Sequence, residues 1–305
     1  MDYHELPRLE DSISFIYAEH AIIEQDNSSL VMIQGTSRTP IPVTAVTCLL
    51  LGPGTSVTHA AMKTMAENGC QTIWCGESLG RYYANGMGET RSAVNILRQA
   101  ELCMNEALHL EVAKLMYQMR FPKLPKNEYT LQQLRGMEGI RMREAYKAAA
   151  SRFGVTWTGR NYKTTEWDEA DPINQALSVG NAILYSVCQA AIVSLGYSTA
   201  LGFVHTGKML SFVYDIADLY KADTTIPAAF EAVKLYPDDL SAGVRRCCRK
   251  RFNAIQLLKR IPRDIEALFS GGQSEHLESK ATRDLWTEEG SIRGGINYSD
   301  WEGVE

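Results

Sequence analysis

The chain has 305 residues, of which 45% are hydrophobic and 22% are charged, and its formal net charge is -5. This length and hydrophobic content are sufficient for one large domain or two ordinary ones with a substantial core. A negative net charge excludes a protein that binds nucleic acid through bulk charge alone. Because no run approaches about 18 apolar residues and the acidic start lacks a basic and apolar leader, we expect a soluble, cytoplasmic protein with no membrane partner.

The first part of the chain has the composition of short β-strands with one helix. Runs rich in β-branched and aromatic residues are bounded by Asn, Ser, Gly and Pro, namely SISFIYAEHAII, SLVMIQG, TPIPVTAVTCLLLG and CQTIWCG. Between the last two runs, TSVTHAAMKTMAENG starts with hydroxyl side chains that can cap a helix and stops at Gly69. Turn residues then fill LGRYYANGMGET. We therefore predict a small N-terminal β-sheet domain over residues 1–87.

From Thr90 onward, hydrophobic residues recur at helical spacing. The segment SAVNILRQAELCMNEALHLEVAKLMYQMRF contains no Gly or Pro and predicts one uninterrupted helical run. Further helices are expected at about 129–152, 171–195, 209–221, 227–235 and 238–269, with Gly, Pro and Asp at their ends. The fold class is therefore α+β, with a larger all-helical domain over 88–271. The polar residues 272–305 have a composition typical of disorder.

Two compositional features concern partners and redox state. The seven cysteines form no CxxC pair, which favours reduced thiols in the core over disulfides. From Ser241 to Arg263, eight basic residues occur without an acid. Arg245 and Arg249 lie four residues apart and share a helix face, so this run is either a solvated helix face or a track for phosphates.

Glu138 is the first residue that packing alone does not explain. In LQQLRGMEGIRMREAY it lies between Gly136 and Gly139, and each glycine inside a helix costs about 1 kcal/mol relative to alanine. Either something approaches this helix closely, or Glu138 is a surface residue on a flexible helix.

The segment FVHTGKMLSFVYDIADLYKAD is more informative. His205 and Lys208 flank a glycine, and Asp215 and Asp218 follow on an apolar helix. Residues three apart lie on one helix face, so the two carboxylates could share one ion, although solvated helix acids are the alternative. Converging Glu, His and Asp side chains would form a mixed nitrogen and oxygen site suited to phosphoryl chemistry, with Lys208 steadying negative charge. No GxxxxGK[ST] loop implies ATP.

Several segments resemble one family. LLLGPGTSVTHAA, LRGMEGIRMREAY, GVTWTGRNY, DPINQALSVGNAILY and LGFVHTGKMLSFVYDIADLYK are similar to the CRISPR-associated spacer integrases, the first of the numbered CRISPR-associated proteins, in their type I-E branch. The resemblance covers roughly residues 9–270. It implies a β domain followed by a helical domain. It also implies a homodimer that joins the second numbered CRISPR-associated protein in a heterohexameric integration complex.

The resemblance also implies an activity and its residues. Glu138, His205 and Asp215 match the metal-binding positions, and Asp218 matches a second functional aspartate. The implied cofactor is Mg²⁺ or Mn²⁺, and the implied reaction is cleavage of DNA and joining of prespacer 3′-hydroxyls to the CRISPR repeat in spacer acquisition and antiviral defence. The implied DNA-facing residues are Arg81, Lys208, Arg245 and Arg249. Two alternatives stay open, a non-catalytic DNA-binding scaffold and a metal phosphohydrolase acting on nucleotides.

Overall fold

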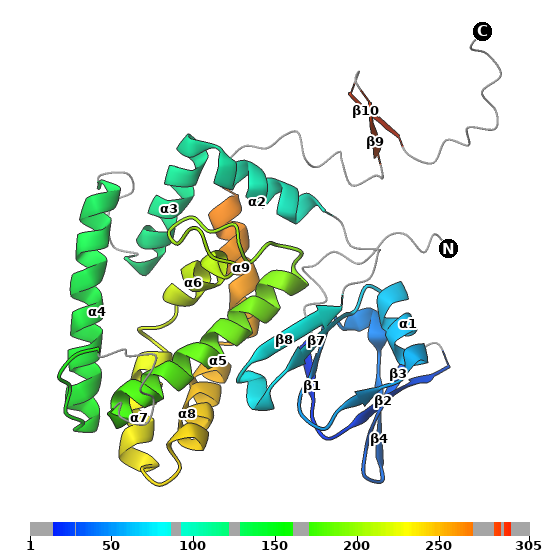
Figure 1. Ribbon diagram of the computed structural model, residues 1–305, viewed down its shortest axis with the longest axis horizontal. Coiled ribbons are helices and arrows are strands. Elements are labelled where there is room, and N and C mark those ends of the chain that lie inside the picture. Colours follow the sequence, from blue (N-terminus) through cyan, green and yellow to red (C-terminus); the bar gives the residue numbers. More distant parts are fainter. Residues whose placement is uncertain are drawn as a thin grey trace.

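The protein is described by a computed structural model over residues 15–27, 29–86, 93–121, 129–160, 171–270, 284–287 and 290–293. Its strands up to Gly86 form one part and its helices from Val94 form another, as Figure 1 shows. This arrangement confirms the predicted α+β class. The predicted domain boundary at 87 and most of the predicted tail lie outside the described residues.

The N-terminal part contains two four-stranded sheets. Its strands and helix are β1 (Phe15–Ala18), β2 (Ile22–Asp26), β3 (Ser29–Gln34), β4 (Ser37–Ile41), β5 (Cys48–Leu51), β6 (Ser56–Val57), α1 (His59–Glu67), β7 (Gln71–Cys75) and β8 (Tyr82–Gly86), with short 3-10 turns η1 (Val43–Ala45) and η2 (Glu77–Leu79). One sheet has the order β1-β5-β7-β8, with only β8 antiparallel to its neighbour, and the other has the order β4-β3-β2-β6. The buried residues between them, including Ile23, Leu49 and Met65, form one core with α1.

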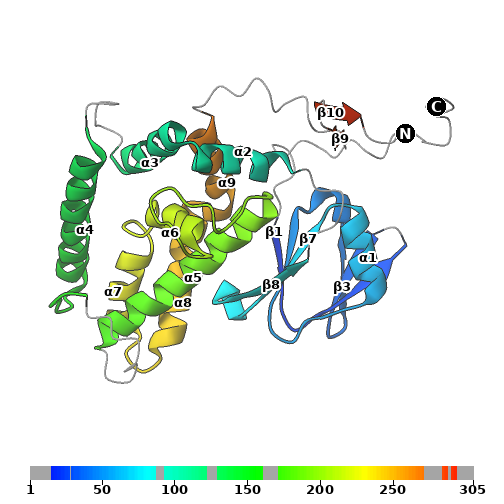
Figure 2. The same cartoon turned by 45° about the horizontal axis from the view of Figure 1, so that its top comes forward.

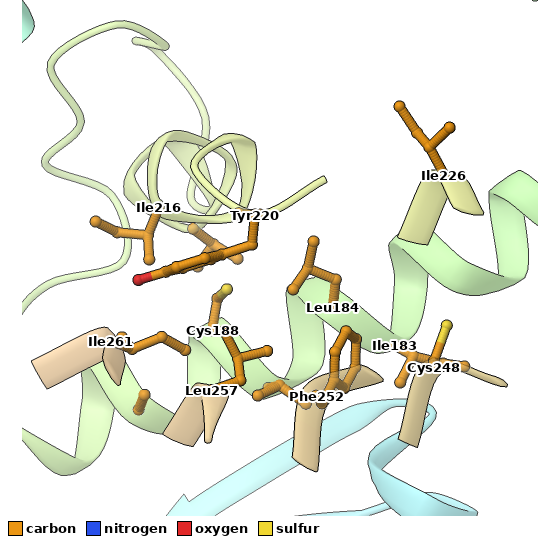
Figure 3. Packing of buried hydrophobic residues seen from close by; sticks show 14 of the residues in the cluster. Ile183, Leu184, Cys188, Ile216, Tyr220, Ile226, Cys248, Phe252, Leu257 and Ile261 are labelled. Carbon is orange, nitrogen blue, oxygen red and sulfur yellow. The ribbon is translucent and has the colours of Figure 1, made fainter. Parts of the chain in front are cut away.

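The helical part is built around α5. Its helices are α2 (Val94–Met104), α3 (Glu106–Arg120), α4 (Leu131–Phe153), α5 (Pro172–Ser194), α6 (Ser211–Asp218), α7 (Thr225–Leu235), α8 (Leu240–Ala254) and α9 (Leu257–Phe269). Figure 3 shows Ile183, Leu184 and Cys188 of α5 packed among side chains from α6, α8 and α9. The opposite side of α5 contacts the first sheet, where Ala190 joins a cluster with Leu50 and Ile73. The sheet and the helices therefore share α5 as a common core element.

The composition of α5 also meets the length and hydropathy of a membrane span. However, 61% of its apolar window is buried inside the protein, as expected for the core helix of a soluble fold. Asp171 caps this helix by accepting a hydrogen bond from the Asn174 amide, and Pro172 follows at its first position.

In contrast, α4 contributes little to the core. It is as long as α5 but has only two buried residues, Leu134 and Ala149. Figure 1 shows it standing at the edge of the helical part, away from the sheets. Its ends are well defined, because Thr130 and Gln133 form a capping box and Gly154 ends the helix with a left-handed φ of 67°.

Two predicted helices are each broken into two. The helical run expected over 92–121 is interrupted at Asn105, whose side chain accepts hydrogen bonds from the Ala107 and Leu108 amides and so starts α3. The expected helix over 238–269 is interrupted at Gln256, which has a left-handed φ of 49°. The expectation of uninterrupted helices was wrong in both places, because a local cap or turn replaced helical propagation.

All seven cysteines are free, and six of them are buried. The prediction of core thiols is therefore confirmed for six of the seven, and Cys103 is half-buried.

Candidate active site

Asp215 lies on the buried face of α6 and holds the loop that precedes this helix. Its exposed fraction is 0%. Oδ2 accepts hydrogen bonds from the amides of Phe203 at 2.6 Å and Val204 at 3.0 Å, and Oδ1 accepts one from the His205 amide at 2.8 Å. A buried carboxylate needs such donors, since burying it without partners is costly. Asp215 therefore fastens residues 203–205 to α6.

The same loop depends on two glycines. A Cβ at Gly202 would clash with the His205 carbonyl and with Ser211, so only glycine allows the loop to close against α6. Gly207 has a left-handed φ of 82°, which L side chains rarely adopt. These glycines let the chain turn sharply from the loop into α6.

The ring of His205 is oriented by Asp215. Nδ1 lies 2.7 Å from Asp215 Oδ1, and because an ionised carboxylate only accepts, Nδ1 carries the proton. This hydrogen bond raises the pKa of His205 above its ordinary value of 6.5, despite the opposing effect of partial burial. Nε2 points the other way and lies 4.0 Å from Asp218 Oδ2. The side chain is 43% exposed, so Nε2 is available to a ligand.

Asp218 lies at the end of α6 and faces a lysine. Its Oδ1 is 2.6 Å from Lys221 Nζ, and this ammonium also lies 4.9 Å from the centre of the Tyr185 ring. Burial lowers the pKa of Lys221, but the Asp218 carboxylate and Tyr185 outweigh it and leave the pKa raised. Lys221 therefore stays charged beside Asp218.

Glu138 on α4 is held by two arginines. Arg141 donates to it through Nε at 2.8 Å and Nη2 at 3.0 Å, and Arg120 donates through Nη1 at 3.3 Å. Arg120 Nη2 also lies 4.0 Å from Asp218 Oδ2. The Arg120 side chain is 3% exposed. Within the described part of the chain, Arg120 Nε and Nη2 donate no hydrogen bond. Arg120 thus lies between the carboxylates of Glu138 and Asp218.

These groups line one cavity of about 760 Å³ between α3, α4, α5 and α6. The lining residues are Tyr117, Arg120, Glu138, Met142, Tyr146, Arg160, Ser178, Asn181, Ala182, Tyr185, Val204, His205, Tyr214, Asp218 and Lys221. Carboxylates, an imidazole, cations and tyrosine rings therefore face one space, an arrangement typical of a site for a charged ligand.

The structure brings Glu138, His205 and Asp218 to this cavity, but Asp215 lies behind His205 and outside the lining. Both oxygens of Asp215 accept hydrogen bonds from the loop, whereas Asp218 faces the cavity. This geometry favours Asp218 over Asp215 as the carboxylate that is open to an ion, and the expected sharing of an ion by the two aspartates stays a prediction. Among the described residues, no three His, Cys, Asp or Glu side chains are already gathered closely enough to hold a metal ion.

The glycines beside Glu138 have no packing role here. A Cβ added at Gly136 or Gly139 would meet no atom within 4 Å. No described residue of this chain therefore approaches the helix closely at these two glycines, which fits the alternative of a residue on the outer face of the helix.

The predicted DNA-facing residues are distributed over separate surfaces. Arg81 and Lys208 are exposed. Arg245 and Arg249 line a second cavity of about 760 Å³ between the first sheet and helices α5, α8 and α9. Arg245 is paired with Glu77 of η2 at 3.4 Å, across the junction of the two parts. Thus only Lys208 belongs to the loop that carries His205.

Arg120, Arg141, Arg160 and Lys221 at the site were not singled out from the sequence. Arg141 and Lys221 each lie three residues after the acid they bind, a spacing at which helical side chains meet. That signal was present in the sequence. Arg120 reaches Glu138 only because α3 and α4 pack together, so local spacing gave no indication of it.

Comparisons with known proteins agree with this fold. The family model described as CRISPR associated protein Cas1 matches residues 15–124 and 118–250. CRISPR-associated endonuclease Cas1 2 of Thermus thermophilus is 46% identical over 300 residues, covering 96% of this chain and 92% of that protein. CRISPR-associated endonuclease Cas1 of Escherichia coli is 41% identical over 266 residues, covering 87% of each.

Among solved structures, the crystal structure of a TtCas1–DNA complex superimposes with a TM-score of 0.81 at 48% identity, covering 88% of this chain and 100% of that chain. A casposase bound to an integration product is 13% identical with a TM-score of 0.54, which shows a shared fold alone. The matches extend through both the sheets and the helices that form the cavity. The chain therefore belongs to the CRISPR-associated protein Cas1 family.

Proposed function

We propose that this protein is a metal-dependent DNA endonuclease and integrase of CRISPR adaptation. The observation that carries the proposal is the cavity in which Glu138, His205 Nε2 and Asp218 face one another beside buried cations. The curated relatives named as CRISPR-associated endonucleases support the nuclease activity, and the TtCas1–DNA complex supports DNA as the substrate.

The donor set at the cavity fits Mg²⁺ or Mn²⁺. Carboxylate oxygens suit both ions, and one imidazole suits Mn²⁺ in particular. We assign the ligands to Glu138, His205 and Asp218, and Asp215 becomes the residue that holds His205 in place. When bound, the ion would withdraw charge from a phosphate and promote loss of a proton from an attacking hydroxyl.

The protein's own side chains contribute orientation and charge. Asp215 keeps the proton of His205 on Nδ1, so that Nε2 is free on the cavity side. Arg120 and Lys221 balance the acids and supply positive charge where a phosphate would enter. Tyr185 and Tyr214 are in edge contact, with ring centres 5.0 Å apart, and present aromatic surface to a nucleotide.

The proposed reaction is a transesterification. A prespacer 3′-hydroxyl attacks a phosphorus of the CRISPR repeat, a new phosphodiester bond forms, and the repeat strand leaves with a free 3′-hydroxyl that takes up a proton. No phosphodiester bond is lost in total, so no nucleotide cofactor is required. Cleavage follows the same course with water as the nucleophile.

The proposal includes partners and place. We propose that the protein acts as a homodimer and assembles with the second numbered CRISPR-associated protein into a heterohexameric integration complex. Its work in spacer acquisition and antiviral defence places it in the cytoplasm.

The proposal is tested by incubating the protein and its small partner with a labelled prespacer and a supercoiled plasmid that carries the repeat. With Mn²⁺ or Mg²⁺ we expect the label to join the plasmid, and with EDTA or the variants Glu138→Gln and His205→Ala we expect no joining. DNA binding without joining in the wild-type protein would instead identify a scaffold. Hydrolysis of free nucleotides without joining would identify a phosphohydrolase.

A further inference from the structure

The loop that carries His205 is held from a second side, by α2 and the start of α3. Figure 2 shows these helices above the loop that leads into α6. Side chains along α2 bond to successive carbonyl groups from residue 195 to residue 202. Asn95 donates to the Leu195 carbonyl at 2.7 Å, and the Cys103 thiol points to the Gly202 carbonyl at 3.5 Å.

Gln99 makes the densest of these contacts. Its side chain is fully buried, with an exposed fraction of 0%. Nε2 donates to the carbonyls of Ser198 and Leu201 at 2.9 Å each, and Oε1 accepts from the Ser198 amide at 2.7 Å. A buried amide with every contact satisfied fixes its neighbours, because losing any one of them leaves a polar group without a partner.

His109 of α3 completes this grip next to the site. Nδ1 lies 2.9 Å from the Cys103 carbonyl and Nε2 lies 2.9 Å from the Phe203 carbonyl, while the ring packs on Phe203 with centres 5.3 Å apart. A carbonyl oxygen only accepts, so the ring nitrogen that faces the Phe203 carbonyl binds it when that nitrogen carries a proton.

The bond from His109 reaches His205 through one peptide group. The Phe203 carbonyl belongs to the same peptide as the Val204 amide, and that amide donates to Asp215 Oδ2 at 3.0 Å. The peptide is thus held at its oxygen by His109 and at its hydrogen by Asp215. Since Asp215 Oδ1 binds the ring of His205, an unbroken chain of hydrogen bonds joins α3 to the imidazole that faces the cavity.

We infer that His109 is a positioning residue for the reaction, which orients His205 through the peptide between Phe203 and Val204 and through Asp215. This inference rests on the proposed function of the cavity. It requires a hydrogen-bond donor at residue 109 that reaches the Phe203 carbonyl. A side chain that only fills the space against Phe203 would not replace it, whereas arginine would, because arginine has several donors and no acceptor.

The test compares His109→Leu, His109→Gln and His109→Arg with the wild-type protein and with the matched control His59→Leu, whose histidine is exposed at the start of α1. In the joining assay we expect His109→Leu to lower kcat about 10- to 100-fold with KM for DNA within about twofold, as for other residues behind a ligand. His109→Gln should be intermediate, His109→Arg should recover most of kcat, and His59→Leu should match the wild type.

A second measurement does not need the reaction. In metal-free protein, ¹⁵N nuclear magnetic resonance should detect the Nδ1 proton of His205 protected from exchange in the wild type and in His109→Arg, and exposed to exchange in His109→Leu. Should His109→Leu fail to fold, His109→Gln carries the comparison. Full kcat in folded His109→Leu and His109→Gln, or equal loss in the leucine and arginine variants, would overturn the inference. Absence of joining in the wild type would instead overturn the proposed function.

Discussion

A single oxygen of Asp215 binds His205 twice, accepting the main-chain amide at 2.8 Å and the ring Nδ1 at 2.7 Å. The position of the loop and the angle of the imidazole are therefore set by the same atom. The second carboxylate oxygen, Oδ2, accepts hydrogen bonds from the amides of Phe203 and Val204. This arrangement makes Asp215 an orienting residue and leaves Asp218 to face the cavity.

Asp215→Asn should separate these roles. The substitution preserves size but turns an NH₂ group toward backbone donors, so we expect the free energy of unfolding to fall by about 1–3 kcal/mol. Metal affinity should fall about 10- to 100-fold, because the residue acts through His205. Denaturant unfolding and Mn²⁺ titration calorimetry measure these changes. Asp218→Asn is the matched comparison and should lose more metal affinity than Asp215→Asn. A larger loss in Asp215→Asn would instead identify Asp215 as the metal ligand.

The pKa of His205 offers a direct readout of the Asp215 hydrogen bond. This bond favours the imidazolium in the folded protein, and so raises the pKa above 6.5. The resulting stabilisation is complete below the unfolded pKa and is lost as pH rises through the folded pKa. Titration of metal-free protein followed by nuclear magnetic resonance should show a lower pKa in Asp215→Asn. An unchanged titration curve would mean that Asp215 does not set the charge of His205.

Arg120 should compete with a metal ion for Glu138 and Asp218. Removing the guanidinium in Arg120→Met leaves two partly buried acids without that partner, a change that costs about 3–5 kcal/mol for a fully buried pair. We expect a lower melting temperature without metal and a larger rise on adding Mn²⁺ than in the wild type. Arg152→Met serves as the control on α4. If Mn²⁺ raised the melting temperature of Arg120→Met and of the wild type equally, the ion would not bind between Glu138 and Asp218.

The pair formed by Arg245 and Glu77 should tune DNA affinity. If Arg245 contacts a phosphate, Arg245→Ala weakens binding and lowers the slope of affinity against salt by about 1. Glu77→Gln frees the same guanidinium and should strengthen binding. Stability should change by less than about 1 kcal/mol on Glu77→Gln, because the Glu77 side chain is 56% exposed. Fluorescence anisotropy at several salt concentrations tests both directions, and variants that shift affinity the same way would exclude this contact.

The order of strands before helices followed from the sequence, because hydrophobic periodicity and turn residues are local signals. The breaks at Asn105 and Gln256 were missed for the same reason. Asn105 has ordinary helical neighbours, and its role as a cap depends on a turn that propensity does not specify. Gln256 adopts a left-handed conformation that glycine or asparagine would have signalled.

The residues that gather at the candidate site could be predicted from the sequence. Which of them face the cavity and which lie behind it could not. Spacing placed Asp215 and Asp218 on neighbouring positions of a helix, yet burial distinguishes them, with exposed fractions of 0% and 22%. Which face of α6 meets the core depends on its packing against α5 and α9, which the local sequence of α6 does not specify. The contact of Arg120 with Glu138 likewise depends on the packing of α3 against α4.

The shallow burial of α4 has a consequence for how the protein opens. Amide hydrogens of α5 lie in the core and should exchange with solvent only when the whole protein unfolds, whereas α4, with two buried residues, should open by itself. Glu138 is carried by the helix that opens. An ion bound to Glu138 together with residues of α6 would therefore slow exchange along α4 much more than along α5. Glu138 would therefore be the last of the ligands to be fixed in place, because α4 unfolds locally more easily than α6.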